Sequence, residues 1–172
     1  MTELADAGIH LHFYGNFSNW KGLAWIDDVR TRARQRRHFH EYVDQRRWVS
    51  EFSRYDAGWL HYFASDNGCE IRRCTWDDLN YPARIPPLVG AGLPLTQRDN
   101  EAATVATQSL ARKLDIGLFF AGVDELVAAT RDKARMSELS RNAWRERDRF
   151  TFDHHADRLI AFFRRVVESR TR

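Results

Sequence analysis

Tyr81-Pro-Ala-Arg-Ile-Pro-Pro-Leu-Val-Gly-Ala-Gly-Leu-Pro-Leu-Thr-Gln-Arg-Asp-Asn100 is the stretch that decides the predicted fold. Proline is tolerated at the start of a helix because its missing N–H would be unpaired there, and glycine often ends a helix. We therefore predict a short helix that Pro82 opens and that ends between Gly90 and Gly92. The apolar residues that follow predict a strand from Leu93 to Gln97.

Arg84 lies at the start of this predicted helix. The free backbone N–H groups of a helix N-terminus attract anions, and a guanidinium can form paired hydrogen bonds with phosphate oxygens. We therefore expect Arg84 to mark a phosphate-binding corner. Without wider context, an arginine at a helix end is more often the donor of a surface salt bridge, and this alternative stays open here.

The residues upstream of this stretch show strand-like and helix-like periods in turn. The predicted elements are a strand from Ile9 to Gly15, a helix from Trp20 to about Arg36, a strand from His38 to Val43, a helix from Gln45 to Arg54 and a strand from Ala57 to Phe63. The residues from Ala64 to Tyr81 have no clear period and predict a long loop. Loops of that length are usually functional or disordered.

The downstream residues continue the alternation of helix and strand. The predicted elements are a helix from Glu101 to Lys113, a strand from Ile116 to Phe120, helices from Val123 to Arg131 and from Met136 to Arg147, and a last helix capped by Asp153, with an apolar stripe of Leu159, Ile160, Phe163, Val166 and Val167. Such alternation predicts an α/β, Rossmann-like, three-layer α/β/α domain with a parallel sheet of about five strands. Ligands of these sheets bind beyond the carboxyl ends of the strands.

Length and composition indicate one globular domain over residues 1–172, because 43% of the residues are hydrophobic and 13% aromatic. No stretch approaches the roughly 20 apolar residues that cross a bilayer, and the first residues lack the pattern of a signal peptide, so we expect a cytoplasmic protein. The 27 basic and 24 acidic residues are interspersed. This pattern favours solvated helix faces over a nucleic-acid surface, and we expect no nucleic-acid partner.

Four histidines, His10, His12, His38 and His40, recur with period two on two predicted strands and could gather on one face. Because parallel strands are covered on both faces, satisfied core or boundary histidines explain them better than a metal site does. Cys69 and Cys74 lack a second pair, so reduced thiols are expected rather than zinc ligands. His61 ends a predicted strand, where catalytic groups often lie, and is a further site candidate.

Several motifs, taken in order, resemble a known family. Phe52-Ser-Arg-Tyr-Asp-Ala-Gly58, Pro82-Ala-Arg-Ile85 and Gly90-Ala-Gly-Leu-Pro94, followed by Phe150-Thr-Phe-Asp153, resemble the carboxyl-terminal, donor-binding half of GT-B fold glycosyltransferases of the group 1, or family 4, type. The resemblance extends from Ile9 to Val167. It implies a domain that binds a nucleoside-diphosphate sugar and belongs to a retaining-type transferase with an unknown acceptor.

The resemblance also implies a donor site. Carried over by position, its residues are Gly15, Asn16, Lys21, Tyr42, Val43, Asn80, Arg84, Ile85, Pro87 and Leu88. The base would lie near Tyr42 and Val43, and the diphosphate near Arg84 and the Pro-rich helix. Lys21 would contact phosphate, and Gly15 and Asn16 would form the floor of the cleft. The mechanism that the resemblance implies needs no metal or other cofactor.

Two departures from the family pattern bear on this expectation. Pro87 stands where the family places a glutamate that accepts the ribose hydroxyls. The chain also has no counterpart of the acceptor-binding domain, so an acceptor-binding domain or partner chain is expected, and the full enzyme could associate peripherally with a membrane. The alternative prediction is a catalytically degenerate Rossmann-like module that serves in binding or protein interaction.

Overall fold

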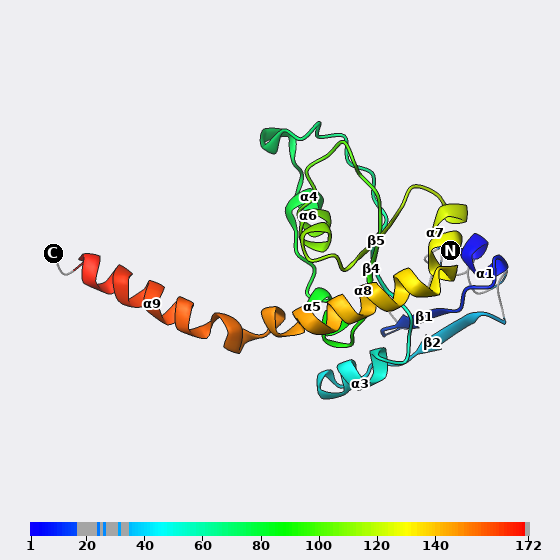
Figure 1. The fold of residues 1–172 in the computed structure, drawn as a ribbon, viewed down its shortest axis with the longest axis horizontal. Helices are drawn as coiled ribbons and strands as arrows, with labels where there is room; N and C mark the ends of the chain where they lie inside the picture. The colour runs from blue at the N-terminus through cyan, green and yellow to red at the C-terminus, as the bar shows by residue number, and fades with distance from the viewer. Residues whose placement is uncertain (17–23, 25, 27–30, 32–34, 171–172) are drawn as a thin grey trace.

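The computed structural model describes residues 1–16, 24, 26, 31 and 35–170. Lys21 and most of the helix expected from Trp20 to Arg36 lie outside these residues. Within the described part, the chain is an α/β protein with two small parallel sheets. Figure 1 shows β1 and β2 at the right of the view, β4 and β5 closer to the middle, and a long carboxyl-terminal helix that extends to the left, away from both sheets.

The first sheet pairs β1 (Leu11–Tyr14) with β2 (Arg37–His40) in parallel. In its register, His12 lies opposite His38 and Tyr14 lies opposite His40. Side chains two residues apart on a strand point to the same face. The register therefore brings the histidines of both strands to one face, as their period in the sequence allowed.

The second sheet has the order β3–β4–β5, with β3 (Gly58–His61), β4 (Leu95–Arg98) and β5 (Gly117–Phe120) all parallel. Leu95, Thr96 and Gln97 of the central strand are all buried. Strands were expected in all five places and are found there. They form groups of two and three, and the structure does not show the single sheet of about five strands that the sequence predicted.

Helical segments fill the rest of the described chain. They are α1 (Thr2–Asp6), η2 (Gln45–Arg47), α3 (Trp48–Phe52), η3 (Ile71–Arg73), α4 (Trp76–Leu79), α5 (Ile85–Gly90), α6 (Ala106–Lys113), α7 (Val123–Arg131), α8 (Lys133–Glu146), η4 (Arg147–Phe150) and α9 (Phe152–Arg170). The boundaries of α7 are those predicted. The loop expected from Ala64 to Tyr81 contains η3 and α4, and α4 begins at a capping box formed by Thr75 and Asp78.

Two clusters of buried side chains form the core. One joins the strands to α5, α6 and α8 and contains Leu60, Ile85, Val89, Leu95, Ala111, Ile116 and Ala143. The other joins β5 to α1, α7 and α8 and contains Leu4, Leu118, Phe120, Leu126, Val127 and Leu139. Helix α8 contributes to both clusters through Ala143 and Leu139, so it holds the two sides of the core together.

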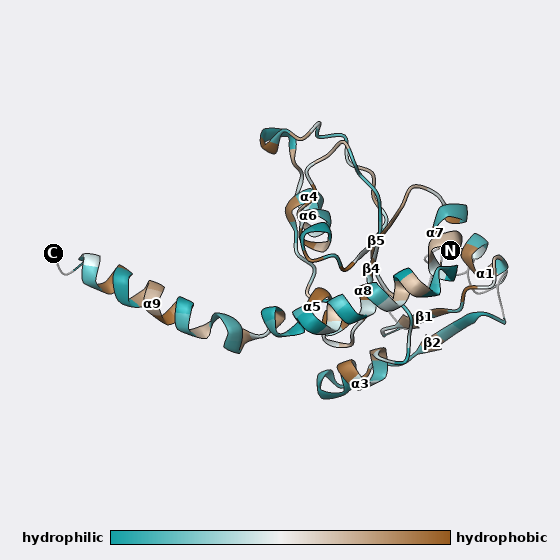
Figure 2. Ribbon diagram, in the orientation of Figure 1, coloured by the Kyte–Doolittle hydropathy of each residue, from teal (hydrophilic) through white to brown (hydrophobic). Residues whose placement is uncertain are grey.

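Helix α9 extends from the body of the protein, and brown apolar segments alternate with teal ones along it in Figure 2. The apolar stripe predicted for it is present and largely exposed: Phe163 is 55% exposed and Val167 is 66% exposed. Asp153 lies inside the helix, which begins at Phe152, rather than capping it. Among the described residues, no helix is both long and apolar enough to cross a membrane.

Candidate functional site

The carboxyl ends of β3 and β4 form the edge at which the sequence predicts a ligand. The long segment after β3 and the segment between β4 and α6 meet there, and Asn67 joins them. Its side-chain nitrogen donates to the Thr104 carbonyl (2.9 Å) and to Ser65 Oγ (3.0 Å). Its side-chain oxygen accepts from the backbone N–H groups of Thr104 (2.9 Å) and Cys69 (3.0 Å). Asn67 therefore replaces the backbone pairing that these irregular segments lack.

A second amide, Asn100, holds the same edge from the other side. Its side-chain oxygen accepts from the Ser65 N–H (2.8 Å), and its side-chain nitrogen donates to the Phe63 carbonyl (3.1 Å). Gln108 of α6 accepts from the Asn100 N–H (3.1 Å) and donates to the Arg98 carbonyl (2.6 Å). The two segments are thus fixed to each other and to α6.

His61 lies at the carboxyl end of β3. Its Nε2 is 2.7 Å from Thr107 Oγ1, which in turn donates to Gln97 Oε1 at 3.1 Å. Burial, and next the nearby positive charge of Arg84, lower the pKa of His61 from its usual value. Within the described chain, the buried His61 Nδ1 and Gln97 Nε2 have no hydrogen-bond partner. Such unpaired polar atoms are uncommon in protein interiors and here lie at the predicted ligand edge.

Arg84 immediately precedes α5, and its guanidinium donates a hydrogen bond to the Leu60 carbonyl near the end of β3. Burial lowers the pKa of Arg84, but an arginine stays protonated in proteins. A guanidinium has five N–H donors, so one bond to Leu60 leaves capacity for a ligand. Arg84 therefore brings a positive charge to the strand edge beside His61.

The first turn of α5 does not offer the free N–H groups that we expected. The Ile85 N–H donates to the Pro82 carbonyl (3.0 Å), and the Leu88 N–H donates to the Arg84 carbonyl (3.2 Å). Pro86 and Pro87, which lie between them, have no N–H. Pro82 also lies outside the helix, which begins at Ile85. A phosphate at this corner would have to be held by side chains.

The other site residues predicted near α5 have mixed roles. Ile85 is 2% exposed and belongs to the core. Leu88 packs so closely on Gly58 that a Cβ at Gly58 would lie 2.8 Å from its methyl groups. Pro87 is half-buried, and Asn80 ends α4 with its N–H donated to the Trp76 carbonyl (2.9 Å). Arg84 and Asn80 thus offer polar groups near this corner, whereas Ile85 and Leu88 are packing residues.

The remaining predicted residues belong to the first sheet. Gly15 and Asn16 directly follow β1, and Tyr42 and Val43 follow β2, so each pair lies after the carboxyl end of its strand as expected. Tyr42 is 69% exposed, and the Val43 carbonyl accepts from Trp48 Nε1 (2.8 Å). Whether these residues contact a ligand stays a prediction.

The four histidines of the first sheet form a ladder with Tyr14, which we call the histidine ladder. His10 Nδ1 lies 3.0 Å from His38 Nε2, and His12 Nδ1 lies 2.9 Å from His40 Nε2. The ring of His38 stacks on that of His12, with 4.3 Å between centroids, and His40 stacks on Tyr14 at 4.5 Å. Hydrogen bonds and ring stacks therefore alternate along one face of the sheet.

The ladder ends on α3 and the turn after it. The Tyr14 hydroxyl donates to Glu51 Oε1 (2.6 Å) and lies 2.5 Å from the Tyr55 hydroxyl. Burial and the neighbouring histidines lower the pKa of His12 to about 4. Burial and the Glu51 hydrogen bond raise the pKa of Tyr14. The sequence indicated the shared face of the histidines, but no local pattern linked Glu51 or Tyr55 to them.

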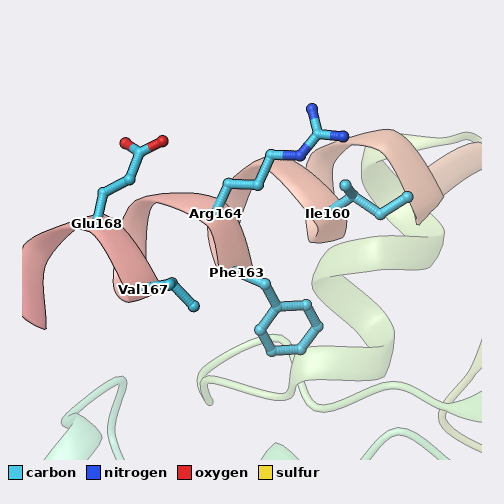
Figure 3. Close-up of a pocket in the computed structure, with 5 residues that line it drawn as sticks. All are labelled: Ile160, Phe163, Arg164, Val167 and Glu168. Atoms are coloured by element: carbon cyan, nitrogen blue, oxygen red, sulfur yellow. The ribbon is translucent and has the colours of Figure 1, made fainter. Parts of the chain in front are cut away.

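The described residues contain no cluster of three or more His, Cys, Asp or Glu side chains that could hold a metal ion. Cys69 and Cys74 are free thiols. A shallow hollow lies on α9, away from the predicted site, and is lined by Ile160, Phe163, Arg164, Val167 and Glu168. In Figure 3, Phe163 and Val167 point to one side of the helix while Arg164 and Glu168 point to the other, so the hollow belongs to its apolar stripe.

Comparisons with protein-family models, with curated proteins and with solved structures find no match for this chain. The fold and the strand edge define the class of protein, an α/β protein with parallel sheets and polar groups at their carboxyl ends.

Proposed function

We propose that this chain is the donor-binding half of a GT-B-type, retaining glycosyltransferase and binds a nucleoside-diphosphate sugar at the carboxyl edge of β3 and β4. In this proposal, the two sheets and their helices are parts of a three-layer Rossmann-like domain. The observation that carries it is the position of Arg84, a guanidinium held at a strand end beside the partly buried imidazole of His61, whose pKa is lowered. Arg84 is exposed to solvent, so its remaining N–H donors are accessible to a diphosphate, which a guanidinium binds through charge-assisted hydrogen bonds.

The proposal assigns the other half of the active site to an acceptor-binding domain or partner chain. Half of an interdomain site cannot transfer a sugar efficiently, because the reacting atoms would not be held together. The exposed apolar stripe of α9 supports the need for such a partner, since a contiguous apolar surface of this kind commonly marks an interaction site. No metal ion is needed for the positive charge, because Arg84 supplies it.

The first prediction concerns nucleotide binding. We expect isothermal titration calorimetry to detect binding of UDP or GDP, and the Arg84→Ala variant to lower the affinity by roughly 10- to 100-fold, because a charge-assisted hydrogen bond contributes about 1.5 to 3 kcal/mol. The diphosphate should bind more tightly than the corresponding monophosphate. Arg141→Ala removes an exposed arginine of α8 that bonds only to Ser137 among the described residues, and should leave the affinity unchanged.

Two results would contradict the proposal. One is the failure of every nucleoside diphosphate to bind the wild-type chain at millimolar concentration. The other is equal affinity of the Arg84→Ala and Arg141→Ala variants. Circular dichroism of both variants shows whether the fold is retained, which separates a lost contact from a lost structure.

The second candidate function is a degenerate Rossmann-like module that binds a partner without turnover. The specific observation that favours it is the first turn of α5, where Pro86 and Pro87 lack N–H groups and Pro87 replaces the carboxylate of the family pattern. The same titration decides between the two, because this candidate requires no affinity for nucleoside diphosphates.

A further inference from the structure

The histidine ladder joins two parts of the fold that the chain does not hold together locally. His12 lies on β1, His10 directly precedes it, and His38 and His40 lie on β2. The end of the ladder, Tyr14, contacts Glu51 of α3 and Tyr55. The His12 ring also packs on Tyr55, with 4.4 Å between centroids. We propose that the histidine ladder is a proton-sensitive latch, which holds the first sheet against α3 near neutral pH and releases it in mild acid.

The hydrogen bonds within the histidine pairs make the latch sensitive to protons. Each N···N hydrogen bond needs one nitrogen that donates and one that accepts, so a neutral pair is fully satisfied. One added proton can still be shared between His12 and His40. A second proton would leave two N–H groups facing each other at 2.9 Å, and protonated His38 would stack its charge on His12 at 4.3 Å. The ladder therefore opposes complete protonation.

Some charged groups around the histidine ladder favour protonation of its rings, and others oppose it. Glu51 attracts the protonated form of His40, whereas His38 and Arg54, which pairs with Glu51 at 3.1 Å, oppose it. For His40, burial outweighs the attraction of Glu51, and its pKa is lowered. Tyr14 donates to Glu51 and lowers the pKa of that carboxyl group, which favours the negative charge beside the ladder.

The lowered histidine pKa values decide whether acid stabilises or weakens the latch. His12 has a pKa of about 4 in the folded ladder against 6.5 for a free histidine, so the released form binds protons more tightly. The latch is intact above pH 6.5 and weakens as the pH falls from 6.5 towards 4. At pH 5 this difference would shift the equilibrium towards release by about 30-fold, which we reduce to about 10-fold because the ring is partly exposed to solvent.

Amide hydrogen exchange and NMR of the wild-type chain, in EDTA so that metal ions are excluded, test the proposal. Between pH 7 and pH 5, opening of β1 and β2 should increase about 10-fold relative to β4 and β5, after correction for intrinsic exchange rates. The Cε1–H resonance of His12 should titrate well below pH 6. Equal behaviour of the two sheets, or titration of His12 near 6.5, would overturn the proposal.

A variant pair gives a second test. His12→Asn removes the titrating ring, so its melting temperature should fall less between pH 7 and pH 5 than that of the wild type, by roughly 2 to 4 °C. The double change His154→Gln and His155→Gln, on exposed positions of α9, should keep the wild-type pH dependence. Equal pH dependence in His12→Asn and the wild type would also overturn the latch. None of these outcomes depends on nucleotide binding.

Discussion

Phe120→Ala is expected to lower the free energy of unfolding by about 3 to 5 kcal/mol, the range for removing a buried phenylalanine ring. Phe120 ends β5 and is 1% exposed. Its ring lies 5.6 Å from that of Trp59 and 5.9 Å from that of Tyr62, both in or just after β3. The change would open a cavity in the cluster that also holds Leu4 and Leu126. Both α1 and α7 would lose packing against the sheet.

Urea unfolding followed by circular dichroism measures this loss. Phe163→Ala is the matched control, because it removes the same ring from the exposed stripe of α9 and should change the free energy of unfolding by less than about 1 kcal/mol. A comparable loss in both variants would mean that the stripe of α9 is buried in solution, for instance in a complex of two chains. A small loss in Phe120→Ala would show that β5 is not packed as described.

Elements with strong local signals were predicted well from the sequence. Helix α7 begins after Gly122 and carries Asp124 and Glu125 in its first turn, where acidic residues favour a helix. Its observed bounds, Val123–Arg131, equal those predicted. The strand predicted from Ile116 to Phe120 is β5, because a short apolar run beside helical segments is typical of a buried parallel strand. In both cases the deciding information lies within a few residues.

The parallel direction of the strand pairs was predicted correctly, but the division of the strands into two sheets was not, because it depends on contacts between distant residues. The sequence indicated five strands but did not encode whether β1 pairs with β2 alone or also with a strand of the second sheet. The dependence on distant contacts also explains why the exposure of the α9 stripe could not be predicted. Its apolar stripe predicts burial, yet no pattern within the helix states whether the chain itself supplies a surface to cover it.

At the candidate site, too, features set by neighbouring residues were predicted, and contacts between distant residues were not. Arg84 was expected at the start of a helix and is found there. The expected free N–H groups are absent from that turn because Pro86 and Pro87 occupy it and because the Ile85 N–H turns back to Pro82. The lack of N–H groups at Pro86 and Pro87 follows from the sequence alone, since proline has no backbone N–H. The contact of Arg84 with Leu60 does not, because 24 residues separate them.

The segments that follow β3 and β4 and meet at the proposed ligand edge depend on buried amides for their position. Among these amides, Asn67 is 1% exposed and makes four hydrogen bonds, two of them to the backbone of Thr104. A backbone group that loses its partner inside a protein costs about 1 to 3 kcal/mol. The loops at the proposed ligand edge are therefore sensitive to Asn67, a residue outside the predicted donor site.

Asn67→Ala is accordingly expected to lower the free energy of unfolding by about 2 to 4 kcal/mol, because the N–H and carbonyl of Thr104 and the N–H of Cys69 lose their partner while part of the loop gains access to water. Urea unfolding measures this change, and amide exchange should show local opening at Cys69 and Thr104. Asn80→Ala removes the same amide from a residue whose described hydrogen bond is made by its backbone, and should cost less than about 1 kcal/mol. If Asn67→Ala were as stable as Asn80→Ala, the two segments would be joined by other contacts. In that case the position of the loop segments at the ligand edge would not depend on Asn67.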